Sequence, residues 1–228
     1  MNYRVCLESG YDVVWAFAHV PELLGCFSKE KKREMALERL PERIQSYLSW
    51  LKTRGESVSL SGEITVTITE EFNCFMVGDY EVGACFEADR KPASRDEIQI
   101  AQMRMGWNRE ELLAKVAYLP TQVLDEKPAG SARSLRQVLN HLAGAELWYI
   151  DRIKSNVPSF KSFPEDAFAR LSSIRDFVIT ELLNLSEEEL SKIVVRDNEE
   201  WTARKVLRRL LEHEREHLLL LDSFLQIS

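Results

Sequence analysis

Four amphipathic helical segments in the C-terminal part of the chain constrain the fold more than any other feature of the sequence. Capping boxes, in which a serine precedes a glutamate or glutamine by three positions, open the first segment at Ser94 and the second at Ser134. The third segment covers residues 165–185, and Thr202 is the expected N-cap of the fourth, which extends to about residue 226. Four helices of about 20 residues joined by loops predict a four-helix bundle.

The first 92 residues have a different pattern, which predicts a small α+β domain. Residues 29–53 carry apolar side chains at helical spacing, and Gly55 follows them as a stop signal. Pro41 lies inside this segment and predicts a kink or a break into two shorter helices. The expected strands have alternating or continuous apolar residues and cover 3–7, 13–17 and 63–69.

The boundary between the two patterns lies in the polar segment EADRKPAS, residues 87–94. This segment contains a helix-stopping proline just before the first capping box. A chain of 228 residues, of which 45% are apolar, is long enough for two modest cores. The sequence therefore predicts an α+β domain at residues 1–92 and an all-α domain at residues 93–228.

The charge of the chain argues against nucleic acid as a partner. The formal net charge is -7 and the isoelectric point is near 5.3, whereas phosphate binding relies on clustered Lys and Arg. No apolar run approaches the roughly 20 residues that span a bilayer, and the N-terminus lacks the basic-then-apolar order of a signal peptide. We therefore expect a cytoplasmic protein that does not bind membranes.

The four cysteines, Cys6, Cys26, Cys74 and Cys85, form no C-x-x-C pair and have no histidine at zinc-finger spacing. In a cytoplasmic chain such residues are expected to be reduced and to pack as small apolar side chains.

Three of the four histidines fall in the predicted bundle, and two of them have the spacing of metal ligands. His213 and His217 are four residues apart, so they differ by about 40° around a helix and lie one turn apart on one face. His141, in the middle of the second helix, is the candidate third ligand. Three histidines would leave open positions on the ion, as in catalytic rather than structural sites. The alternative is a solvated helix face for the pair and a hydrogen-bonded core histidine at 141.

Few other residues suggest a mechanism. Gln137 and Trp148 share the helix face of His141, which makes Gln137 a candidate hydrogen-bond partner of the ligands and Trp148 a candidate wall of a pocket. The glutamates at 212, 214 and 216 flank the pair, and we interpret them as a solvated face, with Glu216 the best candidate for a base.

Residues 94–226 resemble the DinB/YfiT-like superfamily. The resemblance is carried by the second-helix motif SLRQVLNHLAGAELWYIDRI and the fourth-helix motif EEWTARKVLRRLLEHEREHLLLLDSFL. In that family the second-helix histidine and the fourth-helix pair bind a divalent metal, which implies ligand roles for His141, His213 and His217. Family members are often dimers, so the resemblance also implies a homodimer.

The resemblance implies two classes of reaction, because some members of the family are metal-dependent hydrolases and others transfer low-molecular-weight thiols. The expected cofactor is a divalent ion, with Zn, Ni, Mn and Fe all open, and the expected partner is a small-molecule substrate or a thiol. The alternative is a binding or regulatory module in which the bundle is structural and the N-terminal domain binds a partner or ligand.

The N-terminal segment resembles a different family, the HicB-like domains, in which two strands lead to a V-P-E-L-x-G-C motif and then a helix. The residues that carry the resemblance are Val20, Pro21, Glu22, Leu23, Gly25 and Cys26, followed by Ala36 and Leu37. The resemblance implies a partially degraded RNase H-like α+β fold that binds a partner protein. The DNA-binding segment that often follows such domains is not evident, so we expect a dimerisation or ligand-binding module.

Overall fold

A computed structural model describes residues 1–12, 15–127 and 132–225 of the chain, and for residues 222–225 it describes the backbone alone. The chain divides into two compact units. The first unit consists of Met1–Lys91 with Ile193–Trp201, and the second of Pro92–Lys192 with Thr202–Ser228. The first unit is a mixed α/β structure, and the second is mostly helical. No helix in the described part of the chain is long and apolar enough to cross a bilayer.

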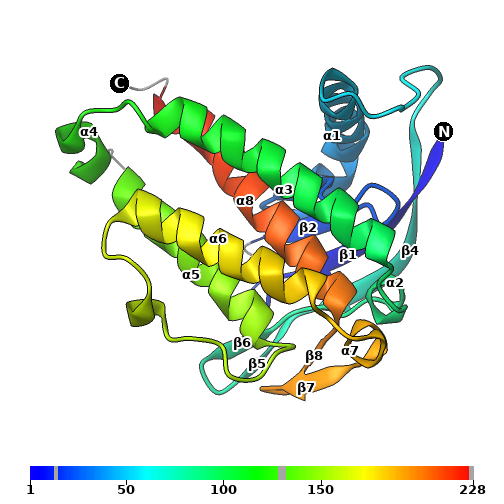
Figure 1. Cartoon of the computed structure of the whole chain (residues 1–228). Helices are drawn as coiled ribbons and strands as arrows, with labels where there is room; N and C mark the ends of the chain where they lie inside the picture. Colours follow the sequence, from blue (N-terminus) through cyan, green and yellow to red (C-terminus); the bar gives the residue numbers. More distant parts are fainter. Residues whose placement is uncertain (13–14, 128–131, 226–228) are drawn as a thin grey trace. The chain divides into compact units, whose positions relative to one another are not determined.

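A four-stranded sheet forms the first unit, with the strand order β3-β2-β1-β4 (Figure 1). Strand β1 pairs antiparallel with β2 and parallel with β4, so β4 returns to the sheet through the helix that precedes it. The bounds of the strands are β1 Asn2–Ser9, β2 Ala16–His19, β3 Phe27–Glu30 and β4 Thr65–Asn73. The predicted strand at 13–17 overlaps β2 at residues 16 and 17, and residues 13 and 14 lie outside the described residues.

Helix α1, Arg33–Thr53, packs against β2, β3 and β4 with a buried apolar face. Gly55 follows it with a φ of 91°, a conformation that costs a glycine little, as the sequence predicts. Of the two alternatives predicted at Pro41, the break is wrong, because α1 continues through this residue, and the kink stays a prediction. Proline removes one hydrogen bond, but the packing of Leu40 and Ile44, both fully buried, holds the two halves on one sheet face. Residues 29 and 30 belong to β3 rather than to the helix.

Two short hairpins complete the first unit, and neither was predicted. They are β5 Phe75–Val77 with β6 Tyr80–Val82, and β7 Val194–Arg196 with β8 Glu199–Trp201. Asp197 and Asn198 connect β7 to β8 with φ values of 54° and 61°, the conformation of a two-residue type I′ turn. A short helix, α2 Glu87–Arg90, ends the N-terminal stretch. All four cysteines are buried, as predicted.

Four long helices of the second unit contact one another: α5 packs on α6 and α8, and α3 packs on α8 and α6 (Figure 1). Their bounds are α3 Arg95–Val116, α5 Leu135–Asp151, α6 Ala167–Leu183 and α8 Ala203–Leu225. Shorter elements lie between them, namely α4 Thr121–Asp125, the 3-10 turn η1 Phe160–Ser162 and α7 Glu187–Ser191.

Three of the four long helices, α3, α5 and α8, begin at the predicted caps. Ser94 and Ser134 both form complete capping boxes, and the Thr202 hydroxyl accepts a hydrogen bond from the Lys205 amide at 3.1 Å. Each cap satisfies backbone N–H groups that have no partner inside the helix, and so fixes where the helix begins.

Candidate metal centre

The structure brings the three predicted histidine ligands together between α5 and α8. His141 comes from α5, and His213 and His217 come from successive turns of α8. Each residue offers one ligand atom, and these atoms all lie within 4.8 Å of one another. The Nε2 atoms of His141 and His213 are 3.1 Å apart, and the ring centroids of the three imidazoles are separated by 4.8 to 5.1 Å. The three rings therefore converge on one point.

The convergence follows from helix geometry. An i,i+4 pair lies on one helix face, and α5 contacts α8 directly, so the pair can meet a side chain from the middle of α5. All three histidines are half-buried. The alternative in which the pair lies on a fully solvated helix face is therefore wrong.

The donor set fits a divalent ion. Two imidazole nitrogens that are each about 2.0–2.1 Å from a tetrahedral ion lie roughly 3.3 Å apart, close to the 3.1 Å between His141 and His213. Metal ligation also requires neutral imidazole. Burial lowers the pKa of His141, and the positive charge of Arg133 lowers it further, while Glu216 acts in the opposite direction. The histidine is thus suited to ligation at neutral pH.

Tyr149 and Arg209 lie beside the histidines, and neither was predicted from the sequence. The Tyr149 ring is buried and meets the His213 ring edge-on, with 5.9 Å between centroids. The Arg209 guanidinium lies 5.7 Å from the Tyr149 ring centroid and donates to its hydroxyl at 3.4 Å. Arg209 is one turn before His213, so a single face of α8 presents a cation and two imidazoles. This four-residue spacing could have identified Arg209 from the sequence.

The other residues named from the sequence take different positions. The Gln137 side chain accepts from the Ser134 amide at 3.0 Å and so closes the cap of α5, while its predicted role toward the ligands stays a prediction. Trp148 is 37% exposed and lines a groove of about 450 Å³ with Leu147, Pro158 and Phe160. Glu216 is half-buried, and its charge acts on His141.

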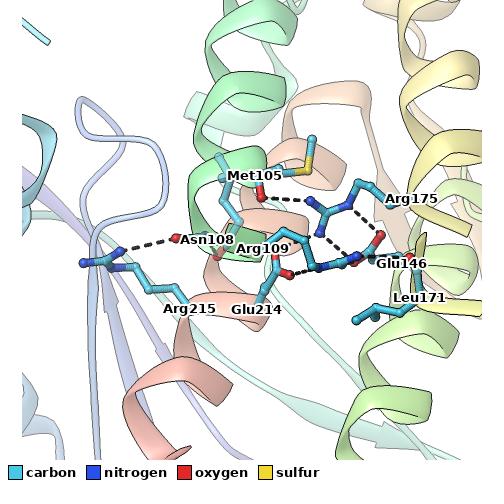
Figure 2. A network of polar contacts seen from close by, with 9 residues as sticks. Met105, Asn108, Arg109, Glu146, Leu171, Arg175, Glu214 and Arg215 are labelled. Atoms are coloured by element: carbon cyan, nitrogen blue, oxygen red, sulfur yellow. Dashed lines mark hydrogen bonds and ion pairs between the residues drawn. The ribbon is translucent and has the colours of Figure 1, made fainter. Parts of the chain in front are cut away.

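The interpretation of the flanking glutamates as a solvated face is wrong for two of them. Glu212 and Glu214 are 2% and 1% exposed. Glu214 points to the interior of the helical unit, where Arg109 and Arg175 bind its carboxylate (Figure 2). The physical reason is that positions 212 and 214 lie on faces of α8 that neighbouring segments cover. A charged side chain that is buried in this way needs an oppositely charged or hydrogen-bonding partner.

Comparison with known proteins agrees with this geometry for the helical unit. No curated protein and no solved structure matches the chain significantly. The sequence model of the DinB superfamily matches residues 104–221, which is just over half of the chain and includes all three histidines. The matched range does not include the sheet region, whose resemblance to HicB-like domains stays a prediction. Through residues 104–221, the chain belongs to the DinB superfamily.

Proposed function

We propose that the helical unit is a DinB-like four-helix bundle that holds one divalent metal ion on His141, His213 and His217 and uses it in catalysis. The observation that carries the proposal is the convergence of three ligand atoms within 4.8 Å from two different helices. The superfamily to which the chain belongs is generally metal-binding, which supports the same assignment.

Three protein ligands leave coordination positions open for water or substrate, whereas structural zinc sites usually have four protein ligands. When bound, the ion would supply Lewis-acid chemistry and lower the pKa of a coordinated water or thiol. The proposed reaction is accordingly hydrolysis of a small molecule or transfer of a low-molecular-weight thiol.

Glu216, Arg209 and the Trp148 groove have distinct roles in this proposal. We assign to Glu216, whose charge acts on His141, the role of accepting a proton from a nucleophile. The Arg209 guanidinium donates to the hydroxyl of Tyr149, whose ring contacts His213, and its positive charge would favour an anionic group on the substrate. We assign the apolar remainder of the substrate to the Trp148 groove, as the sequence predicts a pocket wall at this residue.

The experiment is to load tag-free protein with Zn²⁺, Ni²⁺, Mn²⁺ or Fe²⁺ and to screen ester, amide and thiol-transfer substrates. Glu216→Gln is the informative variant, because it keeps the size of the side chain and removes the base. We expect metal-dependent turnover that falls at least about 100-fold in this variant with metal binding retained. If the protein binds metal tightly but turns over nothing, the alternative of a binding or regulatory module replaces the enzyme.

We propose further that residues 1–92 form the HicB-like domain and bind a partner or a second copy of the chain. The V-P-E-L-x-G-C motif forms a compact turn between β2 and β3, in which the Val20 amide donates to the Cys26 carbonyl at 3.2 Å and Gly25 has a φ of 93°. This conformation supports the resemblance, because the motif glycine is needed where φ is positive. Light scattering on the full chain would give the mass, and a strictly monomeric protein would contradict a homodimer.

A further inference from the structure

Four charged residues meet in the interior of the helical unit, one from each long helix: Arg109 of α3, Glu146 of α5, Arg175 of α6 and Glu214 of α8 (Figure 2). We call these residues the charge quartet. Their side chains are 11%, 4%, 10% and 1% exposed, respectively. Two guanidinium cations face two carboxylates, so the formal charges of the quartet cancel.

Arg175 binds both carboxylates at once. Its Nε donates to Glu146 Oε2 at 2.8 Å, and its Nη2 donates to Glu146 Oε1 at 2.6 Å and to Glu214 Oε2 at 2.8 Å. Its Nη1 donates to the carbonyl of Met105 on α3 at 2.9 Å. One side chain of α6 thus contacts the other three long helices.

Arg109 makes the complementary set of contacts. Its Nε donates to Glu214 Oε1 at 2.7 Å, its Nη2 donates to Glu146 Oε1 at 2.6 Å, and its Nη1 donates to the Leu171 carbonyl at 3.0 Å. All four carboxylate oxygens of the quartet therefore accept from a guanidinium, and both arginines bridge Glu146 on α5 to Glu214 on α8.

The two helices that the quartet joins are the two that carry the histidines. Glu214 directly follows His213, and Glu146 lies five residues after His141. At about 100° per residue, Glu146 lies about 140° from His141 around α5, and Glu214 lies about 100° from His213 and about 60° from His217 around α8. The quartet and the histidines thus tie the same pair of helices together on different faces.

We propose that the charge quartet fixes the axial position and rotation of α5 against α8, so that the three imidazoles stay within reach of one ion. This inference rests on the proposed metal site, and it makes the four residues positioning residues rather than ligands. A slide of α8 by one residue, about 1.5 Å, or its rotation by one position would break the planar fork geometry of both arginines. Apolar side chains tolerate such shifts much better, because their contacts have no fixed direction.

The test compares metal binding by the full chain with and without the quartet. The main variant replaces all four residues by apolar ones of similar size, Arg109→Met, Glu146→Leu, Arg175→Met and Glu214→Leu, which leaves no charge unpaired. The readouts are the Co²⁺ dissociation constant from chelator competition and the visible Co²⁺ absorption spectrum, which reports the ligand geometry. We expect a helical, cooperatively unfolding protein whose dissociation constant is about 10–100-fold weaker and whose spectrum is altered.

Two further variants keep the test decisive. Arg175→Lys retains the positive charge but not the planar fork of guanidinium donors, so it should fold and bind Co²⁺ several-fold more weakly. If the fourfold variant does not fold, this variant tests the positioning role of the charge quartet. Arg170→Met is the matched control, because Arg170 also lies on α6 and donates to Asn140, next to His141, at 2.8 Å. That contact does not reach α8, and we expect wild-type affinity and spectrum.

The outcomes separate this inference from the proposed function. If the wild-type chain binds no Co²⁺, the metal site itself is wrong. If the wild type binds Co²⁺ and the folded quartet variants bind it with unchanged affinity and spectrum, the metal site stands and the positioning role is overturned.

Discussion

Replacing Arg175 by methionine should destabilise the helical unit severely. The side chain is 10% exposed and makes three hydrogen bonds to carboxylates and one to a backbone carbonyl. Its loss leaves Glu146 and Glu214 to share the single cation of Arg109 in a buried site. Breaking a buried ion pair by removing one partner costs about 3–5 kcal/mol, which is a large part of a typical folding free energy of about 5–15 kcal/mol.

The double variant Arg175→Met/Glu146→Leu should be more stable than Arg175→Met alone. It removes one cation and one anion together and leaves Arg109 paired with Glu214 at 2.7 Å, so no net charge remains buried. In a double-mutant cycle with Glu146→Leu, we expect a coupling energy of about 2–3 kcal/mol.

The assay is urea unfolding of the full chain without metal, followed by far-ultraviolet circular dichroism. Arg204→Met serves as the control, because Arg204 makes a more exposed ion pair with Glu97 at 2.5 Å and its loss should cost at most about 1 kcal/mol. A cost below about 1 kcal/mol for Arg175→Met, or single effects that simply add in the double variant, would show that Arg175 and Glu146 are not a coupled buried ion pair.

Three further predictions follow from local geometry. Gly106→Ala should stabilise α3 by about 0.5–1 kcal/mol in the same assay, because an added Cβ meets nothing within 4 Å and alanine favours helix; a loss of stability would contradict this. Gly83→Ala should cost about 1–3 kcal/mol of the stability of the first unit, since its Cβ would lie 2.8 Å from the buried Glu8 Oε1, and a neutral result would count against that packing. Burial raises the pKa of Glu146, but the two guanidinium groups outweigh it and lower the pKa below the usual 4.5. This stabilisation is full above about pH 4.5 and is lost as pH falls through the folded-state pKa of Glu146. The stability advantage of wild type over Arg175→Met/Glu146→Leu should therefore shrink in acid. A constant difference in urea titrations from about pH 6 to pH 3 would exclude this contribution of the Glu146 carboxylate.

The long helices could be predicted from the sequence because their signals are local. Capping boxes and apolar stripes act within a few residues, and they placed the starts of α3 and α5 correctly. The hairpin of β7 and β8 was missed because strands of three residues carry almost no periodicity. Its Asp197-Asn198 turn was the available signal.

The histidine site was predictable, but the charge quartet was not. The spacing of His213 and His217 is a local feature, His141 lies in the middle of another predicted helix, and the resemblance to a known family implied ligand roles for all three. Arg175, in contrast, occupies a position in the apolar stripe of α6 between Leu171 and Val178, where a charge is normally interpreted as a solvated side chain. Its partners come from three other helices, so only the tertiary structure reveals that the charges cancel.

Elemental analysis of the metal content tests whether the three histidines hold an ion. Protein purified without a histidine tag should contain roughly one divalent ion per chain by elemental analysis, because three imidazoles converge between α5 and α8. The ion should be lost in His213→Ala and in His217→Ala, with the helical content unchanged. An ion-free wild type after reconstitution, or an ion retained in both variants, would contradict the account.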